Sequence, residues 1–283
     1  MRPAFPCHKP STLEKPAMNQ PSQYRDMPTR VATPSIFTWL ILVIFLALFI
    51  QGLSGAGFTP DRLLRGAGNL GSFFAQAMPP DFSRIGPIAK AMYETFQMAL
   101  VGVTFGVILS LPMALLCARN TSPAAPVRVV CRGTVATLRT IPDLVWALIF
   151  VVAVGLGPLA GILAIIMDTI GFCARFFSER VEEIRPGPSE ALASTGAGRM
   201  QVITGAVLPE AFPSFVATSL FAVEKAVRSA VVLGLVGAGG IGVELNTAMT
   251  MFRYDQALTI IMIILVVVIG VEQLSSAIRR RVL

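Results

Sequence analysis

Long apolar runs, separated by short polar segments, are the feature of this sequence that most limits its fold. They lie at 36–53, 91–117, 141–155, 159–176, 213–236 and 257–277. Each has about the 20 residues that a helix needs to cross a bilayer, or slightly fewer. Apolar residues spread at helix or strand periodicity around one core would indicate a soluble domain instead. The sequence therefore predicts an all-α integral membrane protein with about six transmembrane helices.

Composition indicates the same class of protein. Hydrophobic residues make up 54% of the 283 residues and charged residues only 14%, whereas about a quarter of the residues in a soluble domain are charged. Such a chain has too little polar surface to stay in solution. Its length fits one membrane domain, which we place at 36–283.

The first 35 residues differ from the rest. They are polar and contain seven prolines, so they favour neither a helix nor a packed core. We interpret 1–35 as a disordered cytoplasmic tail. The first apolar run begins only at Ile36, beyond the position expected for a secretory signal peptide, which predicts an uncleaved anchor.

Basic residues orient the predicted spans. Sixteen of the 23 Lys and Arg residues fall on one side of them, in 1–35, 118–140, 175–212 and 279–281, and five fall on the other side, in 54–90 and at Arg253. Because cytoplasmic loops carry the excess of Lys and Arg, both termini are predicted to be cytoplasmic. The net charge of +7 then reflects topology, and nucleic-acid binding is a poor explanation for it.

Cysteine and histidine are too sparse for the usual metal or thiol chemistry. The four cysteines, at 7, 117, 131 and 173, show no C-x-x-C spacing, and His8 is the single histidine. A metal site, a disulfide framework and a Cys/His nucleophile pair are therefore not expected.

A glycine run, GAGGIG at 237–242, satisfies the pattern G-x-G-x-x-G. A dinucleotide site also requires a strand before this pattern, a helix after it and an acidic residue about 20 positions further on. A new span follows instead, and 256–271 contains no acid. We therefore interpret Gly237, Gly239, Gly240 and Gly242 as glycines at the outer end of the fifth span, where they let backbones approach closely or let the chain turn.

Charged residues inside the predicted spans are candidates for the translocation path or its gating. Glu224, Lys225 and Arg228 lie in the fifth span at spacings that allow all three to share one helix face. Their net charge of +1 suits an anion, and a guanidinium offers forked donors to it. A pair that only stabilises the bundle is the alternative. Asp168, in the fourth span, either pairs with a base on a neighbouring helix or gates the path.

The segment 185–212 has the pattern of two short cytoplasmic helices. Pro186 and Pro188 block the preceding helix, and Ser189 can cap a new one with Glu190 in its first turn. Gly196 provides a turn, and Leu208-Pro209 is predicted to stop the second helix.

These residues resemble the EAA motif of ABC-importer permeases, E-A-A-x3-G-x9-I-x-L-P. Glu190, Ala191, Gly196, Leu208 and Pro209 match it, while Leu192 and Ala206 depart from it at small apolar positions. Over most of 90–283 the chain resembles the phosphonate permeases of that superfamily, including VRSAVVLGLVGAGGIG. The resemblance implies the type I ABC-importer permease fold in a bacterial cytoplasmic membrane, with 185–212 as the loop that couples to an ATPase.

Partners follow from the same resemblance. No lysine follows a glycine, so the phosphate cradle G-x-x-x-x-G-K-[ST] is absent from this sequence. We expect ATP and Mg²⁺ to be bound by a separate ATPase dimer, with no cofactor in this chain, which is then not itself an enzyme. A second copy of the chain, an extracytoplasmic phosphonate-binding protein and membrane lipid complete the expected assembly.

Three functions remain open at this point. The first is the permease of an ATP-driven importer for phosphonates or a related oxyanion such as phosphite, working by alternating access. The second is the same permease with methionine or another small nutrient as cargo. The third is an ATP-independent channel or ion-coupled transporter, in which Asp168 and the Glu224 group would relay ions. Residues 54–90 are expected outside the membrane, on its surface or against the binding protein.

Overall fold

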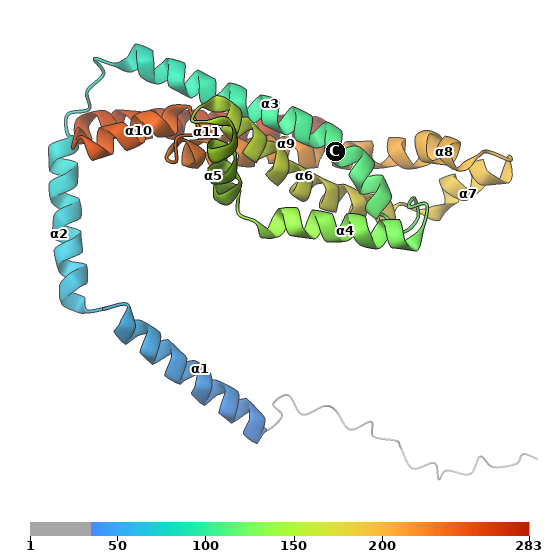
Figure 1. Ribbon diagram of the computed structural model, residues 1–283, viewed down its shortest axis with the longest axis horizontal. Helices are drawn as coiled ribbons and strands as arrows, with labels where there is room; N and C mark the ends of the chain where they lie inside the picture. The colour runs from blue at the N-terminus through green and yellow to red at the C-terminus, as the bar shows by residue number, and fades with distance from the viewer. Residues whose placement is uncertain (1–34, 283) are drawn as a thin grey trace, which may run out of the picture. The chain divides into compact units, whose positions relative to one another are not determined.

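The computed structural model describes residues 35–282 (Figure 1). The chain divides into two compact units, one that ends at Arg65 and one that begins at Gly66, and each is described by itself. The tail expected at 1–35 lies outside the described residues except for Ser35. Helix α1 (Ile36–Gly55) begins where the Ser35 hydroxyl accepts the N–H of Phe37. None of its side chains is buried within the described residues.

The second unit contains most of the remaining helices. They are α3 (Ile85–Cys117), α4 (Ala125–Thr140), α5 (Asp143–Val154), α6 (Pro158–Glu183), α7 (Pro186–Ser194), α8 (Arg199–Val202), the π-helical η1 (Ile203–Val207), α9 (Leu208–Gly234), α10 (Ile241–Thr250) and α11 (Tyr254–Val282). Helix α2 (Pro60–Ala77) precedes them and crosses the division between the units. The residues that the structure describes are thus arranged as helices, as the apolar runs predict.

Helices α3 and α6 form the centre of the core, and α9 packs against both. Their close approach depends on glycine. A Cβ placed on Gly102 would lie 2.6 Å from Ile165 Cγ2, and one on Gly106 would lie 2.5 Å from Thr169 Cβ. Small residues at such positions let transmembrane helices pack backbone against side chain. Farther along, Phe177 of α6 and Phe215 of α9 lie with ring centroids 4.4 Å apart.

Within residues 35–282, five helices are long and apolar enough to cross a membrane, or six if the bent pair α4 and α5 is one span. This agrees with the prediction of about six spans, but the third one differs in form. Helix α5 has only 12 residues, about 18 Å, and meets α4 at 90°. The break falls at Ile141, which is extended because it precedes Pro142.

The predicted helix stop at Leu208-Pro209 is wrong. One helix runs from Arg199 to Gly234, through α8, η1 and α9. Proline lacks an N–H and its ring crowds the carbonyl four residues earlier, which normally breaks an α-helix. Here the turn before Pro209 widens into the π-helix η1, in which the N–H of Leu208 donates to Ile203 O. The wider turn accommodates the proline without ending the helix.

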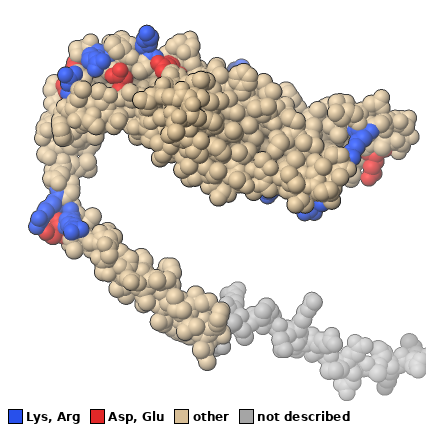
Figure 2. Space-filling view, in the orientation of Figure 1, with Lys and Arg blue, Asp and Glu red and all other residues tan. Residues whose placement is uncertain are grey.

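Charged side chains in the unit from Gly66 onward gather toward its two ends on the face seen in Figure 2, and the surface between them carries few. Large apolar side chains of α3 and α11 are also exposed, among them Phe105, Ile108, Leu265 and Val266. A bundle with few charges between its ends and with exposed apolar side chains is suited to a lipid environment.

Candidate functional site

The residues of the predicted coupling motif fall in two places. Glu190, Ala191 and Gly196 are exposed around the tip formed by α7 and the turn that follows it. Leu208 and Pro209 lie at the start of α9, farther from the tip. Gly196 has φ +85° with open space around its Cα, so its backbone conformation, and not crowding, favours glycine there.

The start of α7 corrects a prediction. Helix α7 begins at Pro186, after Arg185, so Ser189 lies inside the helix and does not cap it. Proline fits the first helical position because its fixed φ is already helical and its missing N–H would have had no partner there. Glu190 consequently lies just beyond the first turn.

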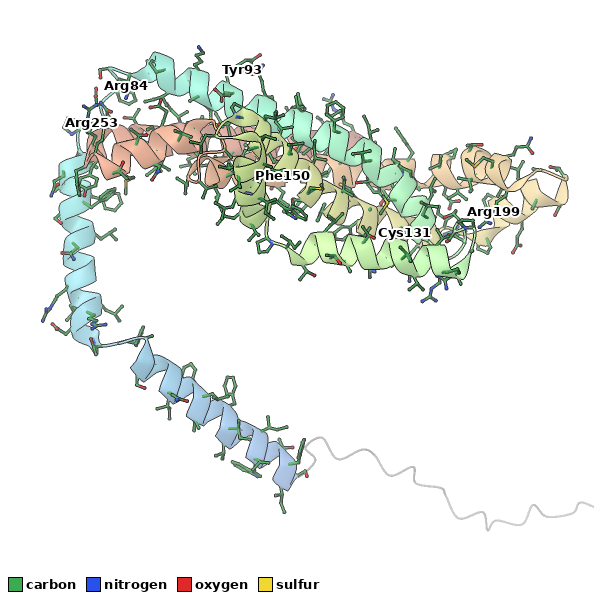
Figure 3. All side chains as sticks on the ribbon, in the orientation of Figure 1. Arg84, Tyr93, Cys131, Phe150, Arg199 and Arg253 are labelled. Carbon is green, nitrogen blue, oxygen red and sulfur yellow. The ribbon has the colours of Figure 1, made fainter. Side chains whose placement is uncertain are left out.

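A contact network around Glu182, at the end of α6, supports the tip formed by α7 and the turn that follows it; we call this network the brace. One Glu182 oxygen accepts the backbone N–H of Arg119 at 2.6 Å and pairs with the guanidinium of Arg132 on α4. Asn120 Nδ2 donates to Val181 O at 2.6 Å, and Arg199 (Figure 3) donates to Ser122 O. The α3–α4 loop is therefore tied both to α6 and to α8.

Sequence patterns give no sign of this brace. Arg132 and Glu182 are fifty residues apart, and each looks like an ordinary charged residue of a cytoplasmic segment. A cavity of about 580 Å³ lies between the brace and α7, lined in part by Glu182, Arg185, Glu190 and Arg199. Space beside the exposed tip would let α7 move without breaking the core.

The three charges predicted on α9 do not act as one group. Lys225 turns toward α6, where its Nζ donates to both oxygens of Asp168 at 2.7 Å and lies 5.3 Å from the ring centroid of Phe172. This pairing with a base on a neighbouring helix is one of the two roles expected for Asp168.

Glu224 turns the other way. Its Oε1 lies 3.0 Å from Arg228, and its Oε2 lies 3.8 Å from Arg279 on α11. The trio separates because consecutive residues on a helix point about 100° apart. Glu224 is 6% exposed, whereas the side chain of Arg228 remains 46% exposed. Two guanidiniums around one carboxylate leave a local charge of +1. The spacing of residues along the sequence does not suggest that Arg279 belongs to this cluster.

The glycine run forms a tight turn after a helix. The residues before it belong to α9 and not to a strand, which excludes the dinucleotide pattern on structural grounds. Gly237, Gly239 and Gly240 have φ of +85°, +87° and +74°. A Cβ on Gly234 would lie 2.6 Å from the Cα of Gly242, so the chain folds closely back on itself here. Helix α10 follows directly after this turn. The apolar pattern of the sequence did not predict it as a separate helix.

The end of the second unit that carries Arg84 and Arg253 (Figure 3) is tied together through Asp81. Asp81 Oδ2 accepts from Gln256 Nε2 at 3.1 Å, and Asp81 O accepts from the Thr259 hydroxyl at 2.9 Å. Hydrogen bonds from the backbone and hydroxyl of Ser83, then from Gln256, hold the pKa of Asp81 below its ordinary value. These bonds connect the segment before α3 to α11.

Comparison with known sequences places this arrangement among transport proteins. The sequence pattern of the family described as binding-protein-dependent transport system inner membrane component matches residues 106–283. The phosphate-import permease protein PhnE of Mycolicibacterium smegmatis is 40% identical over 79% of this chain, which spans 42% of the length of that relative. The phosphite transport system permease protein PtxC of Stutzerimonas stutzeri is 36% identical over 84% of this chain and 85% of its own length.

More distant similarities share the fold. A probable D-methionine transport system permease protein MetI of Vibrio cholerae is 26% identical over 69% of this chain. Among solved structures, an inward-facing MetNI methionine ABC transporter matches with a TM-score of 0.63 and 25% identity, over 71% of this chain and 99% of that one. A bacterial ABC transporter that imports alginate matches with a TM-score of 0.60 and 18% identity, over 86% of this chain and 96% of that one.

Proposed function

Because the chain belongs to the family of binding-protein-dependent transport system inner membrane components, we propose that it is the permease subunit through which an ABC importer moves phosphonates or related phosphorus oxyanions such as phosphite. The observation that carries the general function is the exposed coupling tip around Glu190 and Gly196, joined to a membrane-spanning helix. An ATP-independent channel would leave that tip without a role.

The substrate class is supported by the relatives and by the local charge. Permeases named for phosphate and phosphite are 36–40% identical to this chain, and a methionine permease is only 26% identical. The surplus positive charge around Glu224, Arg228 and Arg279 suits an oxyanion, because a guanidinium donates two parallel hydrogen bonds to it. Methionine is the alternative cargo.

The assembly that we propose contains two copies of this chain, two copies of a cytoplasmic ATPase and an extracytoplasmic binding protein. ATP hydrolysis takes place on the ATPase. The excess of Lys and Arg in 118–140, 175–212 and 279–281 supports cytoplasmic termini. A reporter that is active only in the cytoplasm, fused after Leu283, should be active; an inactive reporter would reverse the topology.

The mechanism we propose is alternating access. Closure of the ATPase dimer displaces α7, and the displacement travels along the helix from Arg199 to Gly234. The path then opens toward the binding protein, and hydrolysis resets the inward-facing state. Arg228, half exposed beside Glu224, is the residue that we assign to oxyanion contact, while the neutral pair of Lys225 and Asp168 gates or stabilises the path.

Uptake of labelled 2-aminoethylphosphonate tests the function. Cells with this chain, its ATPase and its binding protein should accumulate the label, and accumulation should stop when ATP is depleted or this chain is deleted. Excess phosphonate or phosphite should compete. If only methionine competes, methionine and not a phosphonate is the substrate. Transport by the purified chain without an ATPase would refute the proposal of an ATP-driven importer.

A further inference from the structure

One continuous helix joins the coupling loop to the glycine run. The helix from Arg199 to Gly234 has 36 residues, so it is about 54 Å long. Its first residue follows the coupling turn at Gly196–Gly198, and its last residue enters Leu235–Gly240, which we call the glycine turn. A displacement of the coupling loop therefore reaches the glycine turn through this helix. The contacts that hold the glycine turn decide whether the displacement also moves the neighbouring helices.

Helix α3 holds the glycine turn with two neighbouring side chains. The Thr95 hydroxyl oxygen accepts the backbone N–H of Ile241 at 2.7 Å, and Glu94 Oε1 accepts that of Gly240 at 3.4 Å. These N–H groups belong to the start of α10, whose own N-cap residue is a glycine with no side chain to cap it. The first N–H groups of a helix lack partners in their own helix, and its N-terminal dipole favours a carboxylate. Thr95 is fully buried.

The contact between α3 and the glycine turn is tightly packed. A Cβ on Gly240 would lie 2.4 Å from the Thr95 hydroxyl oxygen, and one on Gly239 would lie 2.9 Å from the backbone nitrogen of Pro158 at the start of α6. On that side the N–H of Gly157 donates to Gly237 O at 3.0 Å. The turn is thus clamped between α3 and α6, the two helices at the centre of the core.

We propose that Thr95, assisted by Glu94, is a positioning residue that fixes the far end of the helix from Arg199 to Gly234, so that motion of the coupling loop moves the helices of the translocation path. Without this hydrogen bond the glycine turn absorbs part of the motion, because its glycines have few steric restrictions once released. The inference rests on the permease function proposed above.

Transport per ATP hydrolysed is the quantity that tests it. Thr95→Val keeps the size of the side chain and removes the hydroxyl, whereas Thr95→Ser keeps the hydroxyl. Thr104→Val is the matched control, because among residues 35–282 the Thr104 hydroxyl donates only to Leu100 O of its own helix. The complete complex in liposomes, supplied with 2-aminoethylphosphonate and binding protein, should keep its ATPase activity in T95V but move about fivefold less substrate per ATP, as expected for one lost hydrogen bond. T95S and T104V should keep the wild-type ratio.

An unchanged ratio in T95V, or a loss of ATPase and transport in equal proportion, would overturn the proposal. Should T95V fail to accumulate in the membrane, Gly240→Ala perturbs the same contact from the turn side, and its ratio must fall too. A wild-type complex that transports no 2-aminoethylphosphonate would refute the proposed substrate. The role of Thr95 in holding the glycine turn would then be decided by a second measurement.

That second measurement needs no substrate. Ala238 in the glycine turn is fully buried, so Ala238→Cys, in a chain whose four native cysteines are replaced, should react slowly with a membrane-impermeant maleimide. Adding T95V should speed the reaction severalfold, and adding T95S should not. Equal rates in the two variants would refute the clamp whatever the cargo.

Discussion

At the scale of single residues, the ion pair between Lys225 and Asp168 allows a direct test of what a charge inside the bundle contributes to stability. Its ammonium group is shared between both oxygens of Asp168 and the face of Phe172, and the side chains of the pair are 35% and 21% exposed. Removing one partner of an ion pair inside a bundle is strongly destabilising, because the other charge is left unpaired. Removing both partners often costs little. Single substitutions in this pair should therefore destabilise the chain more than the double substitution does.

Lys225→Met and Asp168→Asn should each destabilise the permease, because each leaves a charge without its partner. Breaking a buried pair costs roughly 3–5 kcal/mol, and the partial exposure of Lys225 lowers this to about 1–3 kcal/mol. The double variant should recover most of the loss. Thermal unfolding of the detergent-solubilised chain measures all three; single variants as stable as wild type would show that the ion pair contributes nothing.

Arg228→Lys should change substrate handling with little change in stability. Arg228 is half exposed, so an ammonium group there keeps the charge but loses the forked donors that suit an oxyanion. We expect the KM for 2-aminoethylphosphonate uptake to rise about three- to tenfold at an unchanged melting temperature. Arg279→Lys is the comparison, since Arg279 is more buried. Unchanged uptake kinetics in R228K would remove Arg228 from the path.

At the scale of elements, the proposed coupling loop depends on one backbone conformation. Gly196 has φ +85°, which proline cannot adopt and alanine adopts only with strain of about 1 kcal/mol. The turn at Gly196 links α7 to the long helix, so a change there alters the link and not the core.

Gly196→Pro should abolish ATP-dependent uptake and leave the chain in the membrane, and Gly196→Ala should reduce uptake partially. Gly187→Ala is the matched control, because Gly187 lies in α7 with open space around it and without a positive φ. Membrane content by immunoblot and uptake of 2-aminoethylphosphonate should be measured on the same cells. Normal uptake by G196P would count against the coupling role.

At the scale of the whole second unit, the Asp81 contacts join the segment before α3 to α11. The pKa of Asp81 is lowered from its model-peptide value of 3.8, first of all by hydrogen bonds from Ser83. A carboxyl group whose pKa is lowered by folding stabilises the folded chain at pH values above 3.8, and this contribution disappears as the pH falls through the lower folded pKa.

Asp81→Asn should therefore lower the melting temperature at pH 7 and have less effect at pH 3, where wild-type Asp81 is largely protonated in the unfolded chain. Thermal unfolding between pH 7 and pH 3 measures the difference between the two proteins. Glu272→Gln, an exposed carboxylate on α11, controls for the general effect of acid. A difference that stays constant over this range would show that the Asp81 charge does not contribute.

The sequence by itself determined the class of protein and the approximate spans, because both follow from local pattern. The coupling motif stays a prediction from the spacing of its residues. Apolar runs of about 20 residues dictate membrane helices, and a positive φ at one place in a loop demands a residue such as Gly196. Local pattern also misled at Pro209, because whether a proline ends a helix depends on the turn that precedes it, and η1 widens to admit it.

Only the tertiary structure decided which distant groups meet. Lys225 pairs with Asp168, Glu224 with Arg279, Glu182 with Arg132, and Thr95 with the first N–H of α10. These partners are 50 to 146 residues apart, so no spacing along the chain reveals them. Each contact joins helices of the second unit that pack on or beside the core of α3, α6 and α9. This packing fixes the rotation of those helices, and the rotation is a property of the packed bundle.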